Sequence, residues 1–171
     1  MRAGTNWGTA ILAFCLCAIF VQGSAAESLL PASDLRADGQ LAKKQGVPLI
    51  VLVSLAGCPH CEVVRRSHLL PLLRGAERAD APVIRQVELR GNASLVDFDG
   101  STITHVEFAR RHRAAIAPVV LFFDGSGRSI ATPLVGAMIP DFYGAYFDAA
   151  LDNARRNVRQ APAKLPAGVS P

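Results

Sequence analysis

The sequence predicts an α/β domain with a central mixed sheet of about four strands, flanked by helices. Short apolar runs rich in β-branched residues alternate with segments of helical periodicity. Strands that are linked through helices are expected to run parallel. The stretch Asp-Gly-Ser-Gly at 124–127 lies between two later apolar runs and predicts an antiparallel hairpin at one edge of the sheet.

The first half of the domain contains the predicted central strand. A helix is expected over residues 33–45, because Ser33 and Asp34 are good capping residues and Gly46 can end it. Residues 47–55 (VPLIVLVSL) are nearly all apolar, which is typical of a strand that is covered on both faces. A helical run then extends from residue 60 to residue 73, with a proline at position 71 that bends or ends it.

The second half predicts three further strands. The expected elements are a strand at 83–89, a polar loop at 90–103, a helix from the capping residue Thr104 to His112, strands at 118–123 and 128–134, and a last helix that begins at Pro140. Pro133 marks the 128–134 strand as an edge strand or as the end of a strand. An apolar stripe along the last helix predicts that it packs on the sheet.

The N-terminus is typical of a secretory signal peptide. Arg2 precedes an apolar stretch at 10–21, and Ser24-Ala25-Ala26 resembles a cleavage site. An uncleaved anchor is the alternative, but 12 apolar residues are short for a membrane-spanning helix, which needs about 20. We therefore expect a signal peptide at 1–26, one domain at 27–157 and a disordered tail at 158–171. An exported protein is expected, most simply in a bacterial periplasm.

The charge pattern argues against nucleic acid as a partner. Without Arg2, the chain has 17 basic and 14 acidic side chains, a net charge of +3. Arginine pairs at 65–66, 110–111 and 155–156 are spread along the chain, as expected for solvated helix faces. Binding of nucleic acid would call for one basic stripe or for aromatic residues that stack on bases.

Only Cys58 and Cys61 remain once the signal peptide is removed. A bridge across two residues closes too short a loop to be a strong structural staple. Covalent haem attachment needs a histidine at position 62, which is Glu62. A zinc site needs four ligands, and the histidines at 60, 68, 105 and 112 form no second pair, so no metal site is assigned. Soft thiolates also bind Cu(I), which leaves a copper-carrying or binding domain as an alternative.

The position of Cys58 suits a reactive thiol. It lies where a strand ends and a helix begins, so its sulfur can face unpaired N–H groups and the positive end of the helix dipole. Pro59 suits a first helical turn, and a protonated His60 adds positive charge. A fall in thiol pKa from about 8.5 to about 3.5 would correspond to roughly 7 kcal/mol of thiolate stabilisation. We predict that Cys58 is the nucleophile and that Cys61, one turn deeper, is the resolving thiol.

Three motifs in this order resemble the thioredoxin fold: C-x-x-C after the apolar strand, the proline in "IAPVVLFF", and the glycine in "LVGA". The resemblance covers residues 47–154 and implies that Pro118 is cis and faces the disulfide, that Ala117 offers backbone pairing to an extended substrate, and that Gly136 lines the substrate groove. From the residues alone, a trans proline and a plain turn glycine are the alternatives. The whole pattern is similar to small periplasmic thioredoxin-like proteins of the SoxW or TlpA type, and the dipeptide Pro59-His60 resembles that of Dsb-type disulfide donors.

The sequence also departs from that family's pattern. Leu52 occupies the position, six residues before the first cysteine, where thioredoxins commonly carry a buried acid, and Gly57 occupies the position of a common tryptophan. Only 60 positions separate Cys58 from Pro118, too few for the helical subdomain of the Dsb-type donors. The resemblance implies a monomeric thiol:disulfide oxidoreductase that acts on protein thiols or disulfides, uses no cofactor and is recharged by a membrane redox partner. The residues do not fix the direction of electron flow.

Overall fold

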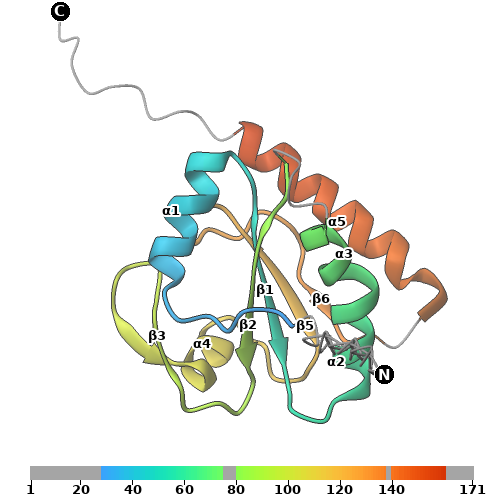
Figure 1. The fold of residues 1–171 in the computed structure, drawn as a ribbon, viewed down its shortest axis with the longest axis horizontal. Coiled ribbons are helices and arrows are strands. Elements are labelled where there is room, and N and C mark those ends of the chain that lie inside the picture. The colour runs from blue at the N-terminus through green and yellow to red at the C-terminus, as the bar shows by residue number, and fades with distance from the viewer. Residues whose placement is uncertain (1–27, 75–79, 138–139, 161–171) are drawn as a thin grey trace, which may run out of the picture.

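A computed structural model describes residues 28–74, 80–137 and 140–160 (Figure 1). The predicted signal peptide at 1–26 and residues 161–171 of the predicted tail lie outside these ranges. The elements are α1 (Leu35–Gln45), β1 (Leu49–Ser54), α2 (Pro59–Val64), the π-helical segment η1 (Arg65–Leu69), α3 (Leu70–Arg74), β2 (Val83–Glu88), β3 (Ser94–Val96), β4 (Thr102–Thr104), α4 (His105–Arg111), β5 (Val119–Phe123), β6 (Leu134–Val135) and α5 (Pro140–Gln160).

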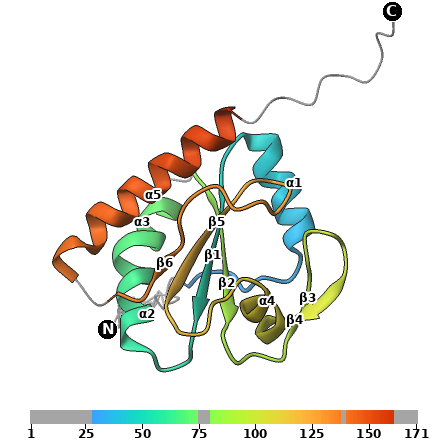
Figure 2. The ribbon, with the colours of Figure 1, turned by 180° about the vertical axis from the view of Figure 1, so that it is seen from behind.

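The predicted fold class is confirmed: a mixed sheet of four strands, in the order β2-β1-β5-β6, lies between two layers of helices. β1 pairs with β2 in parallel and with β5 antiparallel, and β6 pairs antiparallel with β5. Figures 1 and 2 show α1 and α4 on one face of the sheet and α2, α3 and α5 on the other. The second face therefore carries the helix that begins at the two cysteines.

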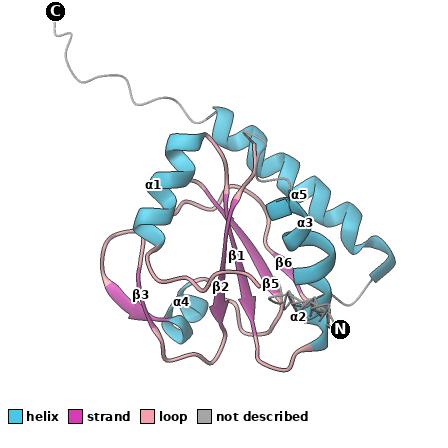
Figure 3. Ribbon diagram, in the orientation of Figure 1, coloured by secondary structure: helices cyan, strands magenta, loops and turns pink. Residues whose placement is uncertain are grey.

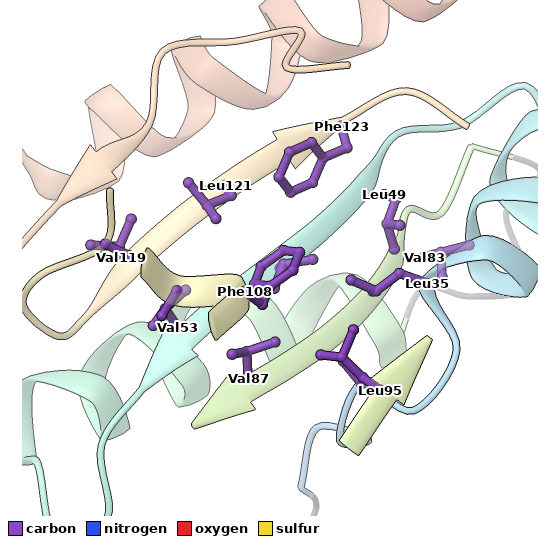
Figure 4. Packing of buried hydrophobic residues seen from close by; sticks show 14 of the residues in the cluster. Leu35, Leu49, Val53, Val83, Val87, Leu95, Phe108, Val119, Leu121 and Phe123 are labelled. Carbon is purple, nitrogen blue, oxygen red and sulfur yellow. The ribbon is translucent and has the colours of Figure 1, made fainter. Parts of the chain in front are cut away.

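β1 is buried along its whole length, as the apolar run predicts. Its alternate residues Leu49, Val51 and Val53 pack with α1 and α4 in one apolar cluster, part of which is shown in Figure 4. Ile50 and Leu52 point to the other face and pack against α2, α3 and α5. The central strand thus has no solvated face, and the core lies on both sides of it.

β5 runs antiparallel to β1, so the expected parallel direction for this strand is wrong. The preceding helix, α4, starts at the carboxyl end of β2, where the Val106 N–H donates to the Gly91 carbonyl at 3.0 Å. Its seven residues span only about 10 Å. The chain therefore does not return to the amino end of β1 but enters the sheet at the carboxyl end, where Val119 pairs with Val53.

Residues 90–103 were expected to be a polar loop, but they contain the hairpin β3–β4 (Figure 3). Each strand has only three residues, too few for a clear alternating pattern, yet Leu95 and Ile103 are buried in the core. His105 is also buried. Its Nδ1 accepts the Glu88 N–H at 3.1 Å and its Nε2 donates to the Ala32 carbonyl at 2.8 Å, so one neutral tautomer satisfies both partners.

The prediction of a strand at 128–134 is wrong in position, whereas the prediction of a tight turn before it is confirmed. The Gly127 N–H donates to the Asp124 carbonyl at 3.1 Å, and Phe123 forms an isolated antiparallel bridge with Ser129. A regular strand resumes only at β6, directly after Pro133. Proline lacks the N–H that a ladder needs, which accounts for the interruption.

The helix after the cysteines continues to Arg74 but is not uniform. Between α2 and α3, η1 has the wider π-helical turn, in which the Leu70 N–H donates to the Arg65 carbonyl. The expected distortion at Pro71 therefore lies before this residue, which cannot donate to the Ser67 carbonyl. The other predicted helices are confirmed, with Asp34 capping α1, Thr104 capping α4, and α5 extending to Gln160, three residues past the expected domain boundary. Within the described ranges, no helix is long and apolar enough to cross a membrane.

The half-buried setting of His112 predicts that stability falls in acid. Its ring packs 4.3 Å from Phe108 and 4.9 Å from Phe123, centroid to centroid, and burial lowers the pKa of His112 although Asp97 opposes the shift. The folded state disfavours the protonated ring, so its contribution is present above the unfolded pKa of about 6.5 and is lost as the pH falls below that value.

The unfolding free energy of the wild type should fall when the pH is lowered from 7.5 to 5. In His112→Phe this fall should be smaller, by up to about 1 kcal/mol. Urea unfolding at both pH values measures this difference, and the shared contribution of His68, whose pKa burial also lowers, cancels in the comparison. An exposed-site variant, His60→Phe, is the control. Equal acid sensitivity in His112→Phe and wild type would contradict the assignment.

Candidate active site

The two cysteines lie where the chain leaves β1. The Cys58 N–H donates to the Leu55 carbonyl at 3.1 Å, which closes a turn between the strand and α2. Gly57, the third residue of this turn, has φ +72°. Glycine adopts this left-handed backbone without a steric penalty, whereas a tryptophan there would be strained. The departure from the thioredoxin pattern at this position thus has a backbone cause.

Cys58 and Cys61 form a disulfide in this structure, with Cα atoms 5.3 Å apart. Cys58 is the N-cap residue of α2, and its Sγ accepts the Cys61 N–H at 3.2 Å. Cys58 is half-buried, while Cys61 is buried. An incoming thiolate therefore reaches the sulfur of Cys58 more readily than that of Cys61. The functional roles predicted for the two residues remain predictions.

The dipeptide between the cysteines faces solvent. Pro59 occupies the first position of α2, where its missing N–H has no helical acceptor, and both Pro59 and His60 are exposed. The imidazole of His60 therefore lies at the surface, at the amino end of the helix. Its predicted role as a modulator of Cys58 remains a prediction.

The other predicted site residues lie at the same end of the sheet as the cysteines. The Ala117–Pro118 peptide bond is cis, as the resemblance implies, and it directly precedes β5. The Gly136 N–H, after β6, donates to the Pro118 carbonyl at 2.8 Å. Because β5 begins opposite the carboxyl end of β1, Pro118 and Gly136 lie at the end of the sheet from which the Cys58 turn emerges.

A polar network under the cysteine turn was missed in the sequence. Ser54, the last residue of β1, is fully buried, and its hydroxyl accepts Nη2 of Arg65 at 3.2 Å. Nε of Arg65 donates to Oε1 of Gln86 at 3.0 Å, and Gln86 donates to Glu88 at 2.6 Å. The signals were the single serine in an apolar run and an arginine four residues after Cys61.

Glu62 gives this network a negative partner at its solvent side. Its carboxylate contacts Nη1 of Arg65 and lies 3.3 Å from Nε of Arg66. The hydrogen bond from Arg65 is the main reason that the pKa of Glu62 is lowered. The side chain of Glu62 is 48% exposed, so solvent screens its charge, whereas only 14% of the Arg65 side chain is exposed.

The sheet position that holds an acid in thioredoxins is apolar here. Leu52 is fully buried between Gln86 on β2 and Val120 on β5. No carboxylate of β1 therefore lies beneath the cysteines. The polar groups on this side of the sheet include the Ser54 hydroxyl, the Arg65 guanidinium that it binds, and the Gln86 side chain.

Of the four histidines considered as metal ligands, His60 is exposed and the other three contact aromatic rings or backbone groups instead. His68 lies 5.1 Å from Tyr143, ring centroid to ring centroid, His105 bonds to two backbone groups, and His112 packs on Phe108. Within the described residues, no group of three or more histidine, cysteine or acidic side chains is placed to hold a metal ion.

Comparison with known proteins finds similarity only among solved structures. Neither a protein-family model nor a curated protein sequence matches the chain. A thioredoxin-fold protein from Helicobacter pylori aligns at 14% identity over 67% of this chain and 83% of that chain, with a TM-score of 0.43. Spinach chloroplast thioredoxin F aligns at 13% identity over 72% of this chain and 97% of that chain, with a TM-score of 0.43. A thioredoxin from Nicotiana alata aligns at 14% identity over 73% of this chain and 98% of that chain, with a TM-score of 0.42.

The strand order and directions of this chain, with a C-x-x-C disulfide at the start of α2 and a cis proline before β5, are those of a thioredoxin-like fold.

Proposed function

We propose that this protein is an exported thiol:disulfide oxidoreductase that exchanges disulfides with protein substrates through Cys58 and Cys61. The observation that carries the proposal is the unequal exposure of two bonded sulfurs at a helix start. Cys58 is partly exposed and its Sγ accepts a backbone N–H, while Cys61 is 1% exposed. This is the asymmetry that exchange through a mixed disulfide requires.

In the oxidising direction, a substrate thiolate attacks Sγ of Cys58. The Cys58–Cys61 bond breaks, a bond forms between Cys58 and the substrate, and the electron pair leaves on Cys61. A second substrate thiolate then attacks the substrate sulfur of this mixed disulfide and expels Cys58 as a thiolate. The substrate loses two electrons and gains a disulfide, and the protein is left as a dithiol.

In the reducing direction, the Cys58 thiolate attacks a substrate disulfide and Cys61 resolves the mixed disulfide. Both directions depend on a stable anion at Cys58. In the disulfide state, the Cys61 N–H donates to Sγ of Cys58, and the same bond would stabilise the Cys58 thiolate in the reduced state. The amino end of α2 adds positive potential at the same place.

We propose that an extended substrate docks at the end of the sheet beside the cysteines, on a strip formed by residues 116–118 and 135–136. Ala117 precedes the cis bond, and the Gly136 N–H and Pro118 carbonyl are already bonded to each other. Ile116 and Val135, next to these residues in the chain, are 51% and 64% exposed and give the strip an apolar surface. Backbone pairing at Ala117 would then align a substrate sulfur with Cys58.

Export to the periplasm and recharging by a membrane redox partner complete the proposal. Their support is the pattern of residues 1–26 and the pairing of two cysteines in the remaining chain. The similarity to SoxW- and TlpA-type proteins suggests the same setting.

The first prediction concerns the thiol reactivity of the reduced protein. The alkylation rate of Cys58 by iodoacetamide should have a pH midpoint at least about one unit below the ordinary value of about 8.5. Cys61 should react at least about tenfold more slowly, because it is buried. Mass spectrometry of peptides after timed alkylation from pH 4 to pH 9 measures both rates, and Cys58→Ser is the control. A midpoint for Cys58 near 8.5 would contradict the proposed thiolate.

The second prediction concerns covalent capture of substrates. Cys61→Ser should accumulate mixed disulfides with exported proteins, because the thiol that releases them is gone, and a Cys58→Ser/Cys61→Ser variant should accumulate none. Non-reducing electrophoresis of a periplasmic extract detects the adducts. The absence of adducts, together with copper bound to the purified wild-type protein, would favour the copper-carrying alternative.

The third prediction concerns reversible oxidation. The mature protein should titrate as a two-electron dithiol in glutathione buffers, with a potential near −120 mV if it donates disulfides and near −270 mV if it reduces them. Gel-shift labelling of free thiols measures the reduced fraction. A pair that stays oxidised across the whole glutathione range would instead indicate a structural disulfide.

A further inference from the structure

We infer that Arg65 is a positioning residue for the resolving step, and that its guanidinium, fixed beneath the cysteine turn, stabilises the thiolate of Cys61. This inference rests on the proposed function. It addresses a problem that the chain itself poses: Cys61 must lose a proton while buried, and Leu52 leaves β1 without a carboxylate below it. Burial alone would raise the pKa of a thiol.

Arg65 lies one helical turn after Cys61. Its N–H donates to the Cys61 carbonyl, so the two residues are neighbours on one helix face, with Cβ atoms about 5–6 Å apart. Helical side chains lean toward the amino end of the helix. The guanidinium follows this direction and reaches Ser54, four residues before Cys58.

The guanidinium is held in place by neutral groups on its inner side. Ser54 accepts a hydrogen bond from Nη2 of Arg65 at 3.2 Å, and Gln86 accepts one from Nε at 3.0 Å. Neither side chain carries a charge that would cancel that of the guanidinium. The charge is therefore immobile and little screened, with 14% of the side chain exposed. A fixed cation at this depth acts on a neighbouring thiolate more strongly than a solvated one.

Other charged groups also face this region. Glu62 lies on α2, and Arg66 and His68 lie on the same π-helical segment as Arg65. From β2, Glu88 is linked to the guanidinium through Gln86, and β1 supplies only the Ser54 hydroxyl. From α5, Asp148 acts on His68. Glu62 opposes Arg65, so the net effect on Cys61 is smaller than that of an isolated cation.

The step that Arg65 assists is balanced within the chain and its substrate. Cys61 releases its proton to solvent, and the Cys61 thiolate attacks Sγ of Cys58 in the mixed disulfide. The bond between Cys58 and the substrate breaks, the Cys58–Cys61 bond forms, and the electron pair leaves on the substrate sulfur, which then takes a proton from water.

The test measures the Cys61 thiolate directly, in a Cys58→Ser background, from the absorbance at 240 nm as a function of pH. Arg65→Gln should raise the Cys61 pKa by about one unit, the size expected for one partly cancelled charge at this separation. Arg65→Lys keeps a positive charge at this position, so its Cys61 pKa should stay close to that of the protein with Arg65. Arg66→Gln is the matched control, because Arg66 also contacts Glu62 but its side chain is 76% exposed, and it should change the pKa by less than about 0.3 unit.

The same substitutions are then made in the protein that keeps both cysteines, and its catalysis of insulin disulfide reduction by dithiothreitol is measured against pH. Only Arg65→Gln should move this pH profile to higher pH. An unchanged Cys61 pKa in folded Arg65→Gln would overturn the inference, as would loss of fold in both Arg65→Gln and Arg65→Met, judged by circular dichroism. If the wild type shows no exchange activity, the proposed function fails, while the pKa measurement still decides the electrostatic role of Arg65.

Discussion

The sheet and the candidate site both depend on the complete burial of β1. This strand pairs with β2 on one side and β5 on the other, and its side chains fill two apolar clusters. An unpaired charge anywhere along this strand would cost several kcal/mol. Polar chemistry begins only at Ser54, where the strand ends, and the cysteines follow in the next turn. The core therefore determines where the site is located.

The regular parts of the fold were predictable because their causes are local. The apolar run at 47–55, the caps Asp34 and Thr104, and the Asp-Gly-Ser-Gly turn each determine a conformation through neighbouring residues. The direction of β5 was not predictable in this way, since it depends on the length of α4 relative to the sheet. The β3–β4 hairpin was missed because three-residue strands carry too short a pattern.

In the candidate site, too, the residues in local motifs were predictable, and those that depend on strand pairing were not. The cysteine pair and Pro118 were identified from motifs, and the structure brings Pro118 and Gly136 to the sheet end where the cysteine turn lies. The Arg65 network could not be read from the sequence, because it needs the pairing register of β1 with β2. That register places Gln86 opposite Leu52 and Glu88 opposite Ser54. Only then do an arginine on the helix and a glutamine on β2 meet.

On the proposed function, the two sulfurs are stabilised as anions by different means. Sγ of Cys58 accepts the backbone N–H of Cys61, which a side-chain substitution does not remove. On our inference, Cys61 relies on one side chain, the Arg65 guanidinium that Ser54 holds in place. A carboxylate at position 52 would repel both thiolates, and the leucine there removes that repulsion. Each feature favours the reduced, anionic state over the disulfide, and a stabilised reduced form makes a disulfide a stronger oxidant. The exposed Glu62 carries the opposing charge, and the balance between these groups sets the redox potential of the pair.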